Sequence, residues 1–373
     1  MEDRDYMAHA IELAKLGKGK VNPNPMVGAV LVKGKRIIGE GYHERYGGDH
    51  AEVMAFKNCV ENAEGATLYV TLEPCSHYGK TPPCVVRVIK EKVKRVVIGM
   101  LDPNPLVAGR SIKRLQEEGI EVTVGVMEDK CKSLNAVFCK YILEQTPFVL
   151  LKTAMSLDGK IATVTGESRW ITGEAAREEV HHLRHLLKGI MVGSETVLKD
   201  NPRLDCRITD GRCPIPIVVD SRLRIPLTSY LVTHAKVNHL IVATLETCED
   251  EKVKKLEAVG VSVLKLPEKA GHVDLKALMQ SLGVLGIDGI LLEGGGTLNE
   301  AALKAGIVDQ VRCYIHPSFI GGKEAPTPVT GEGFLKLQDS VVLQEVKIHQ
   351  IGEDICIEGL VQKERGNECL QAL

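Results

Sequence analysis

Residues 67–84 read TLYVTLEPCSHYGKTPPC, which predicts a strand, a loop and the start of a helix. The run Thr67–Leu72 is rich in apolar, β-branched and aromatic side chains, as is typical of a buried strand. Cys75 follows the end of that strand, and Cys84 comes at the start of the next helix. The stretch therefore predicts an α/β unit that carries two thiols at a strand-to-helix junction.

Predicted helices and strands alternate on both sides of this stretch. Strands that alternate with helices imply a sheet covered on both faces. We expect strands over residues 27–32, 36–42, 67–72, 95–99 and 121–124. We expect helices over residues 5–16, from about 50, from about 83 and over 109–118, and one long helix over 129–144.

A domain boundary is predicted at Pro147, because proline cannot continue the helix before it. We expect one domain over residues 1–146, a second over 147–365 and a loose tail over 366–373. The second domain ends in β-rich stretches, which predict an antiparallel end to its sheet. Its expected strands are 148–154, 189–193, 216–220, 239–244, 261–266, 289–293, 310–317, 341–350 and 354–362.

The composition is that of a soluble globular protein, with 44% hydrophobic and 26% charged residues. The net charge is −2 and aromatic residues make up 4%, so we expect no nucleic-acid partner. No apolar run reaches the ~18 residues of a membrane helix, and the charged start is unlike a signal peptide. The 11 scattered cysteines fit free thiols in a reducing compartment, so we expect a cytoplasmic protein without a membrane partner.

His50, Cys75 and Cys84 predict a zinc site with three protein ligands and an open fourth position. Water can occupy that position, and zinc lowers the pKa of a bound water toward ~7. Glu52 stands two residues after His50, and at the first turn of a helix both side chains can reach one point. We expect Glu52 to shuttle protons and not to bind the metal. The alternative is a closed zinc knuckle with His77 as fourth ligand, which leaves Glu52 unexplained.

A second group of motifs follows strands of the second domain. Residues 292–300, LEGGGTLNE, join a strand to a helix, where glycines let the backbone approach a phosphate. Alone, this motif is also compatible with a simple tight turn. Lys152 and Asp158 flank another junction of this kind, and residues 193–202 form a third. The only tryptophan, Trp170, taken alone, predicts a buried side chain.

The first domain resembles the deaminase half of the bifunctional riboflavin-biosynthesis deaminase/reductase family. The resemblance rests on the phrase at 71–84, with its stretched cysteine spacing, and on Asp102-Pro103-Asn104-Pro105. It implies a cytidine-deaminase-like three-layer α/β/α domain with zinc. It also implies substrate contacts at Asn24, His43, Lys80, Asp102 and Asn104. Amide side chains suit the edges of a polar pyrimidine, and the Lys80 ammonium suits a phosphate.

The second domain resembles the reductase half of the same family, whose fold is similar to dihydrofolate reductase. The resemblance places Lys152 and Asp158 near the reacting centre. The implied NADPH contacts are Ala154, Trp170, Thr196, Asp200, Ser221, Gly295, Gly296 and Thr297. The implied substrate contacts are Ser168, Arg184, Leu204, Arg207 and Glu293. Two positions depart from the family pattern, which usually has a threonine at Asp205 and a small residue at Glu195.

The resemblance implies two reactions on phosphorylated pyrimidines. The first is zinc-dependent hydrolytic deamination of a diaminopyrimidinone ribosyl phosphate, and the second is NADPH-dependent reduction of its ribosyl group to a ribityl chain. We also expect a homo-oligomer. One alternative is a polynucleotide or nucleoside deaminase fused to an accessory nucleotide-binding domain; near-neutral charge and few aromatics disfavour a polynucleotide substrate. The other is a closed zinc knuckle beside a binding domain without turnover.

Overall fold

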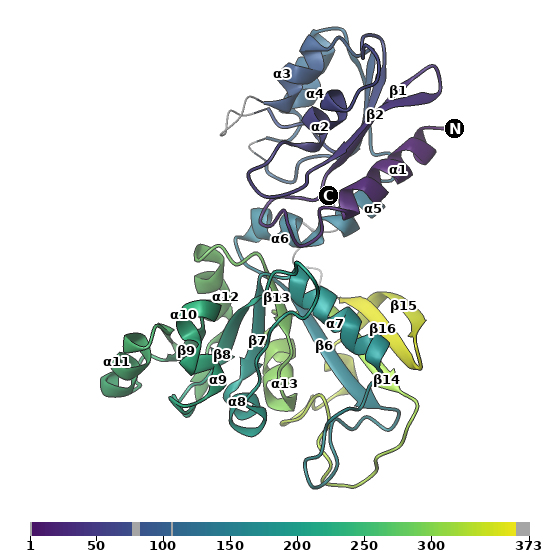
Figure 1. The fold of residues 1–373 in the computed structure, drawn as a ribbon. Helices are drawn as coiled ribbons and strands as arrows, with labels where there is room; N and C mark the ends of the chain where they lie inside the picture. Colours follow the sequence, from purple (N-terminus) through teal and green to yellow (C-terminus); the bar gives the residue numbers. More distant parts are fainter. Residues whose placement is uncertain (1, 77–82, 106, 363–373) are drawn as a thin grey trace. The chain divides into compact units, whose positions relative to one another are not determined.

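The structure is a computed structural model that describes residues 2–76, 83–105 and 107–362 (Figure 1). The described residues form two compact units, one ending at Gln145 and the other beginning at Thr146. His77, Lys80 and the expected tail at 366–373 lie outside the described residues. Within the described ranges, no helix combines the length and apolar character needed to cross a membrane.

The N-terminal unit is built on a five-stranded sheet in the order β2-β1-β3-β4-β5. The first three of these strands pair antiparallel, and β3, β4 and β5 pair parallel. The strands are β1 (Gly28–Lys33), β2 (Arg36–Tyr42), β3 (Thr67–Leu72), β4 (Arg95–Met100) and β5 (Glu121–Val124). The helices are α1 (Asp3–Lys15), α2 (Ala51–Lys57), α3 (Cys84–Lys90), α4 (Arg110–Glu117), α5 (Glu128–Leu134) and α6 (Ala136–Glu144).

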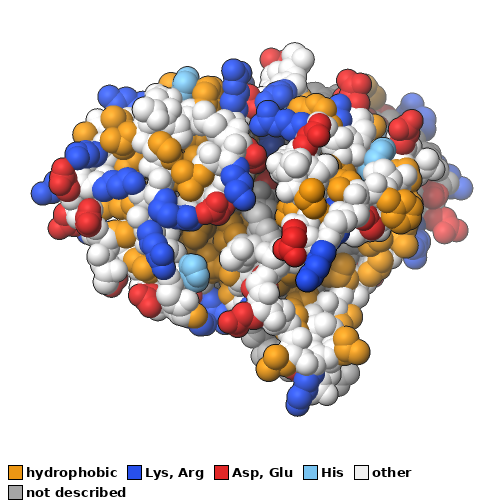
Figure 2. Space-filling model, turned by 90° about the horizontal axis from the view of Figure 1, so that it is seen from below, with side chains coloured by type: hydrophobic (Ala, Val, Ile, Leu, Met, Phe, Trp, Pro, Cys, Tyr) orange, Lys and Arg blue, Asp and Glu red, His pale blue; other side chains and the backbone are white. Residues whose placement is uncertain are grey.

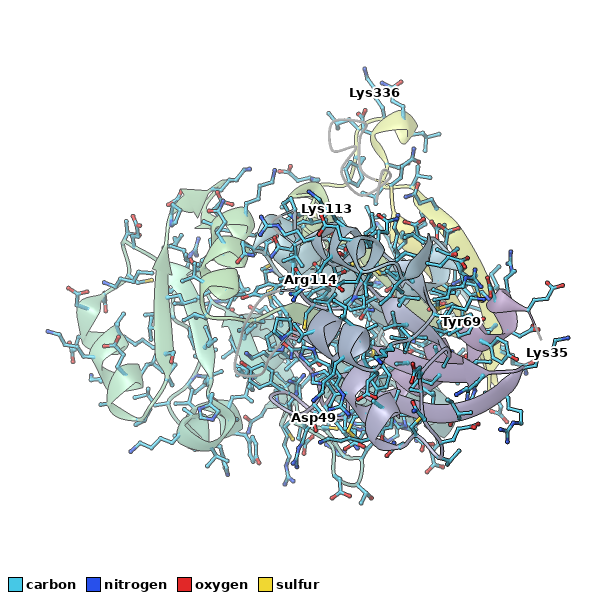
Figure 3. All side chains as sticks on the ribbon, turned by 90° about the horizontal axis from the view of Figure 1, so that it is seen from above. Lys35, Asp49, Tyr69, Lys113, Arg114 and Lys336 are labelled. Atoms are coloured by element: carbon cyan, nitrogen blue, oxygen red, sulfur yellow. The ribbon has the colours of Figure 1, made fainter. Side chains whose placement is uncertain are left out.

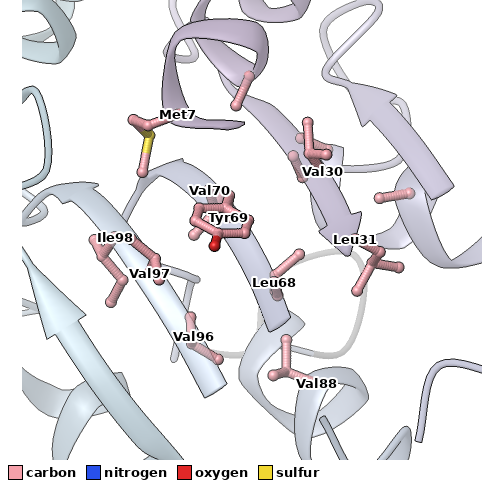
Figure 4. Packing of buried hydrophobic residues seen from close by; sticks show 14 of the residues in the cluster. Met7, Val30, Leu31, Leu68, Tyr69, Val70, Val88, Val96, Val97 and Ile98 are labelled. Carbon is pink, nitrogen blue, oxygen red and sulfur yellow. The ribbon is translucent and has the colours of Figure 1, made fainter. Parts of the chain in front are cut away.

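Side chains of the central strand β3 alternate between two helical layers, as the strand period requires. Tyr69 faces α1: its ring lies 5.0 Å from that of Tyr6, and its hydroxyl donates to Asp3 at 2.8 Å. Leu68 points to the other face, toward Val88 of α3 (Figure 4). All of these apolar side chains are buried. The unit is therefore a three-layer α/β/α sandwich, and the expected fold class is confirmed.

The expected single helix over 129–144 is wrong, because the chain leaves helical geometry at Asn135 between α5 and α6. Asn135 is buried, and both the oxygen and the nitrogen of its side-chain amide bond to the backbone of a distant residue, Met26. It accepts from the Met26 amide at 2.8 Å and donates to the Met26 carbonyl at 2.9 Å. Asparagine side chains that bond to backbone groups compete with the helix. Here the partner lies more than 100 residues away, so local sequence could not reveal the break.

The C-terminal unit is built on a nine-stranded sheet in the order β10-β9-β8-β7-β13-β6-β14-β16-β15. The pairing is parallel from β10 to β14 and antiparallel from β14 to β15, which confirms the expected antiparallel end. These strands are β6 (Phe148–Ser156), β7 (Gly189–Gly193), β8 (Ile215–Val219), β9 (Ile241–Leu245), β10 (Ser262–Leu266), β13 (Gly289–Leu292), β14 (Gln310–His316), β15 (Leu343–Ile351) and β16 (Asp354–Val361).

Helices join these strands (Figure 1), and two short strands pair as a separate hairpin. The adjacent strands β7, β13 and β6 are parallel, so the loops after them leave from the same edge. The helices are α7 (Glu174–Leu186), α8 (Ser194–Asp200), α9 (Tyr230–Thr233), α10 (Ala235–Asn238), α11 (Asp250–Ala258), α12 (Leu275–Val284) and α13 (Gly296–Lys304). The hairpin is β11 (Glu268–Lys269) with β12 (His272–Val273), and a 3-10 turn covers Leu337–Asp339.

Replacing Asn135 by alanine should destabilise the N-terminal unit. The change leaves the amide and carbonyl of the half-buried Met26 without their side-chain partner, which typically costs about 1–3 kcal/mol. Urea unfolding of Asn135→Ala measures the loss. Asn62→Ala is the control, because Asn62 is exposed and its side chain accepts from the Glu64 amide only two residues away. Equal stability of the two variants would show that the hydrogen bonds between Asn135 and Met26 do not stabilise the unit.

Candidate active sites

Three metal-ligand side chains meet at one end of the N-terminal sheet. His50 is the residue before α2, Cys75 follows β3, and Cys84 is the first residue of α3. His50 Nδ1 lies 3.6 Å from Cys75 Sγ and 3.3 Å from Cys84 Sγ. All three ligand atoms lie within 4.8 Å of one another, and in the described residues no other group of three or more His, Cys, Asp and Glu side chains does so. Sequence-distant residues thus form one compact donor set.

These distances fit a tetrahedral zinc ion. Zinc bonds of ~2.3 Å to sulfur and ~2.0 Å to nitrogen at tetrahedral angles place the two donors about 3.5 Å apart. The backbone amide of Cys84 also donates to Cys75 Sγ at 3.2 Å, which orients that sulfur. One histidine and two cysteines leave a fourth position for another group. The residues present therefore fit a catalytic zinc site.

The charge state of the two thiols also favours a cation. A hydrogen bond from Cys84, together with His50, lowers the pKa of Cys75 to about 4 although burial opposes this. The same contact with Cys75, together with burial, raises the pKa of Cys84. The hydrogen bond to Cys75 raises the pKa of His50 to about 9. Two thiolates at this spacing repel each other, so a bound dication is what would allow both to ionise.

Glu52 lies beside this donor set. It is the second residue of α2, its side chain is 3% exposed, and its carboxyl hydrogen-bonds the Cys84 thiol. Burial, together with Cys75, raises the pKa of Glu52 to about 7. Its position at the first turn of α2 puts it next to the ligands without joining the group of three. A buried carboxylate beside an open metal position can accept and return a proton.

Asn24 and His43 form a chain that leads to the metal ligands. The ring of His43 lies 5.4 Å from the ring of His50, edge to face. His43 Nδ1 lies 2.9 Å from the carbonyl of Asp49, which can only accept, so Nδ1 carries the proton. Burial lowers the pKa of His43, which favours the neutral ring. Its Nε2 then accepts from the Asn24 amide at 3.2 Å, which fixes how Asn24 presents its own carbonyl oxygen.

Asp102 and Asn104 lie on the loop after β4, which neighbours the loop that carries Cys75. Asp102 Oδ1 accepts from the Asn104 amide at 2.9 Å. Glu73 is 3% exposed and accepts from the backbone of this loop; the sequence analysis did not single it out. A glutamate directly after an apolar strand was the available signal. Lys80 and the alternative ligand His77 lie outside the described residues.

In the C-terminal unit, Lys152, Arg184 and Glu293 form a buried charge cluster. Arg184 Nε and Nη2 donate to the two carboxylate oxygens of Glu293 at 2.9 and 3.1 Å. Lys152 Nζ lies 3.9 Å from Glu293 Oε2. Burial alone would raise the pKa of Glu293, but Arg184 and Lys152 hold it at about 2. Burial lowers the pKa of Lys152, and Arg184 adds to this while Glu293 opposes it. The cluster carries one excess positive charge, which suits an anionic ligand.

Asp158 takes part in different contacts. Its Oδ1 accepts from the Ser156 hydroxyl at 2.6 Å and from the Ile320 amide at 3.1 Å, and its Oδ2 accepts from the Gly321 amide at 2.7 Å. The Ser156 hydroxyl, followed by the Ile320 amide, lowers the pKa of Asp158 to about 2. None of these partners belongs to the Lys152 cluster. The hydrogen bonds tie the turn after β6 to the segment after β14.

The expectation of a buried tryptophan is wrong, because Trp170 is 66% exposed. The guanidinium of Arg177 lies over its ring, 4.9 Å from the ring centroid. Ser168, two residues before, is half-buried. Ala154 packs against the buried cluster under α7 that contains Val180. An exposed indole presents a flat apolar surface on which a planar ligand can stack.

The two departures from the family pattern are both ion-paired. Glu195 pairs with Arg224 at 2.6 Å, and Arg224 also donates to the Ser194 hydroxyl at 2.8 Å. Asp205 pairs with Arg207 at 3.1 Å, and its carbonyl accepts from Arg184 Nη1 at 3.0 Å. Asp205 therefore ties the 204–207 loop to the buried cluster and supplies a counterion to Arg207.

The remaining expected cofactor contacts lie on loops and helix starts of this unit. Leu204 is buried with a positive φ of 55°. Ser221 Oγ accepts from the Val273 amide at 3.1 Å, and a serine hydroxyl that accepts one hydrogen bond can still donate another. Thr196 is half-buried on α8, and Asp200, the last residue of α8, accepts through its carbonyl from Arg169.

Two of the three glycines in the loop after β13, Gly295 and Gly296, have different surroundings. A Cβ on Gly296 would lie 2.6 Å from Thr330 Oγ1 and 2.8 Å from the Thr327 carbonyl. A Cβ on Gly295 would have nothing within 4 Å, and its φ of −73° suits any residue. Thr297 Oγ1 lies 3.5 Å from the hydroxyl of Thr330. Internal packing explains Gly296, whereas the space beside Gly295 is open to a ligand.

Two protein families match the chain, one in each unit. The cytidine and deoxycytidylate deaminase zinc-binding region matches residues 1–100, and the RibD C-terminal domain matches residues 147–357. The chain is 49% identical to riboflavin biosynthesis protein RibD of Actinobacillus pleuropneumoniae, over 97% of this chain and 96% of that one. It is 41% identical to the Escherichia coli protein of that name, over 96% and 99%.

Solved structures agree over the whole length. RibD of Acinetobacter baumannii superimposes with a TM-score of 0.86 at 37% identity, covering 97% of this chain and 99% of that one. A diaminohydroxyphosphoribosylaminopyrimidine deaminase/5-amino-6-(5-phosphoribosylamino)uracil reductase of Thermotoga maritima gives a TM-score of 0.82 at 36% identity, covering 96% and 99%. Both units and their order along the chain are therefore shared with these proteins.

Alanine at Gly295 and at Gly296 should have different effects. Gly296→Ala forces a clash with backbone and side-chain atoms and should destabilise the C-terminal unit by about 1–3 kcal/mol. Gly295→Ala should change stability by less than about 0.5 kcal/mol. If a phosphate approaches this backbone, Gly295→Ala should nevertheless weaken NADPH binding. Thermal unfolding and calorimetric titration measure the two effects. Unchanged NADPH affinity in Gly295→Ala would remove this loop from the cofactor site.

Proposed function

The chain belongs to the RibD family of bifunctional riboflavin-biosynthesis enzymes, which join a deaminase to a reductase, and from that premise we propose how each unit works. The N-terminal unit hydrolyses the exocyclic amine of 2,5-diamino-6-(5-phosphoribosylamino)pyrimidin-4-one. The C-terminal unit then reduces the ribosyl group to ribityl phosphate. The observation that carries the proposal is the meeting of His50, Cys75 and Cys84 beside buried Glu52.

In the deaminase, His50, Cys75 and Cys84 would hold Zn²⁺, which when bound supplies an activated water at neutral pH. Glu52 would take one proton from the attacking water and give it to the ring nitrogen, and would then carry the remaining proton of that water to the departing amine, which leaves as ammonia. Its burial keeps bulk water from exchanging with that proton. Asn24, held by His43, binds an edge of the pyrimidine, together with Asp102 and Asn104. Lys80 is assigned to the phosphate.

In the reductase, NADPH supplies the hydride that reduces C1′ of the ribosyl group. Lys152 lies in a buried, cationic setting and delivers a proton to the ring oxygen as the sugar opens. Arg184 has five N–H groups, of which three are engaged by Glu293 and Asp205. The other two, together with Arg207, Ser168 and Leu204, bind the sugar phosphate. Asp158 holds the turn after β6 in place and thereby sets the position of the strand that carries Lys152.

The cofactor occupies the sites named for it along the strand ends of this unit. Trp170 offers a stacking surface, and Ala154 lies on β6 with Lys152. Thr196, Asp200 and Ser221 surround the adenosine end, and the Gly295–Thr297 loop receives the pyrophosphate at the start of α13. The open space beside Gly295 supports this placement.

A polynucleotide substrate is not supported by the surface. Lysine, arginine, aspartate and glutamate side chains are interspersed on the face in Figure 2, so this face offers no single-sign track for a phosphate backbone. A closed knuckle would also leave the buried carboxyl of Glu52, beside the three ligands, without a role. We therefore keep small phosphorylated pyrimidines as the ligand class.

We also propose that the chain forms a homo-oligomer in the cytoplasm. Large apolar side chains are exposed on the C-terminal unit, which is typical of a surface covered by a partner. They include Phe319 (77% exposed), Leu335 (98%), Leu337 (94%) and Ile348 (68%). Lys336, between two of them, lies on a segment that projects from the ribbon (Figure 3). Light scattering of the purified chain tests the assembly.

One experiment tests both assigned reactions. The zinc-loaded chain is incubated with the diaminopyrimidinone ribosyl phosphate, with and without NADPH, and the products are identified by mass spectrometry. We expect the deaminated ribosyl compound without NADPH and the ribityl compound with it. An unchanged substrate in both reactions would contradict the proposed chemistry.

Glu52→Gln should abolish deamination while the chain keeps one zinc ion. The amide preserves shape but cannot accept and return a proton, a role typically worth about 10²–10⁴-fold in rate. Ammonia release and metal analysis of the full chain measure the two quantities. Reduction of pre-deaminated substrate is the internal control and should be unchanged. Loss of zinc in Glu52→Gln would instead make Glu52 a ligand.

The reductase should prefer NADPH to NADH. The Ser221 and Thr196 hydroxyls can donate to the 2′-phosphate, and Arg224 donates to the hydroxyl of Ser194, two residues before Thr196. Comparing kcat/KM for the two cofactors, with deaminated substrate, measures the preference. Ser221→Ala and Thr196→Val should reduce it by about tenfold for each lost hydrogen bond to a charged group. Equal use of NADH by the unaltered enzyme would refute the preference.

A further inference from the structure

We propose that Glu73 is a positioning residue of the deaminase, one that holds the Asp102–Asn104 loop in its substrate-binding arrangement. The inference rests on the proposed function only in assigning Asp102 and Asn104 to the substrate. Glu73 lies two residues before Cys75 and is 3% exposed. Its backbone amide donates to the Met100 carbonyl at 3.0 Å, so it extends the pairing of β3 with β4 by one residue. This placement puts its side chain under the loop that follows β4.

The carboxylate of Glu73 accepts four hydrogen bonds from that loop and the helix after it. Oε2 accepts from the Asp102 amide at 3.3 Å and from the Gly109 amide at 3.0 Å. Oε1 accepts from the Ser111 hydroxyl at 2.7 Å and from the Ser111 amide at 3.2 Å. These donors lie at both ends of the segment 102–111. One side chain therefore closes the loop on itself.

The chemistry of these contacts requires a carboxylate. All four partners donate, and an ionised carboxylate is an acceptor at both oxygens. Glutamine would turn one oxygen into an NH₂ group that faces backbone donors. A buried carboxylate without its hydrogen bonds is costly, so the loop and the side chain stabilise each other. No metal contact is needed for this role, because Glu73 stands outside the His50, Cys75 and Cys84 group.

The position of the loop matters because Asp102 is held both at its backbone and at its side chain. Its amide is held by Glu73, and its Oδ1 is held by the Asn104 amide at 2.9 Å. If the first contact is lost, Asp102 and Asn104 move together and both substrate contacts change. Deamination should then show a binding defect, whereas Glu52 and the metal ligands keep their arrangement.

The test is Glu73→Gln in the full, zinc-loaded chain. KM for deamination should rise by about tenfold or more, since loss of hydrogen bonds to a charged group costs roughly that factor each. We expect kcat to change less than about twofold, and zinc content and reductase activity to stay unchanged. In amide hydrogen exchange, the Asp102 and Gly109 amides should lose protection, whereas those of β4 keep it. Glu61→Gln is the matched control, because Glu61 pairs with Arg36 at the surface.

A double-mutant cycle separates positioning from general stability. If Glu73 acts through Asp102, Glu73→Gln combined with Asp102→Ala should raise KM no further than Asp102→Ala alone. Additive effects, loss of zinc or an unchanged KM would overturn the proposal. Should Glu73→Gln fail to fold, Ser111→Ala removes only the hydroxyl hydrogen bond and should raise KM in the same direction by a smaller factor. If the unaltered chain does not deaminate, the proposed function fails, while hydrogen exchange still decides whether Glu73 holds the loop.

Discussion

Parallel pairing of β3 with β4 is the constraint on which the N-terminal site depends. Two parallel strands end at the same edge, so the loop with Cys75 and the loop with Asp102 must begin side by side. The helix that starts at Cys84 then brings the second thiol back to the first. His50 lies at the start of α2, the helix that follows the edge strand β2. A shift of this register by one residue would separate the ligands from the loop proposed to read the substrate.

The C-terminal unit uses the same rule for a different chemistry. Strands β7, β13 and β6 are parallel neighbours. The short helix α8 follows β7, the glycine loop follows β13, and Lys152 lies on β6. Here the site is organised by buried charge. Glu293 accepts two hydrogen bonds from Arg184, and its negative charge opposes the lowering of the Lys152 pKa by burial. The three side chains therefore stay charged although they are largely buried. A fixed cationic surface of this kind binds an anion without first reorganising.

Much of the fold followed from periodicity, because strands and helices of an α/β unit carry strong local patterns. The expected strands and their alternation with helices agree with the structure, and so does the antiparallel end. The two failures have different causes. Asn135 breaks a helix through Met26, which lies more than 100 residues away. Trp170 is exposed, with the nearby Arg177 over its ring, although tryptophan side chains are usually buried.

In the candidate sites, too, local spacing identified some residues, whereas roles that depend on distant contacts were missed. Spacing alone selected His50, Cys75 and Cys84, since few arrangements of these residue types serve anything other than a metal. Glu73 was missed because its four donors are backbone amides and a serine, which carry no signature. The separate contacts of Asp158 were equally unreadable, since both of its backbone partners come from a segment about 160 residues later.

The ion pair between Asp205 and Arg207 has a consequence for how the reductase meets its ligand. If Arg207 binds the sugar phosphate, as proposed, that phosphate would displace an anion that the loop already carries. Binding there would be an exchange of counterions and not the neutralisation of a bare cation, so the affinity of this loop should vary weakly with salt. A phosphate dianion could compete with the single charge of the carboxylate, whereas an uncharged sugar would leave the pair closed. Under the proposed assignment, the aspartate at position 205 would therefore favour phosphorylated molecules over uncharged ones.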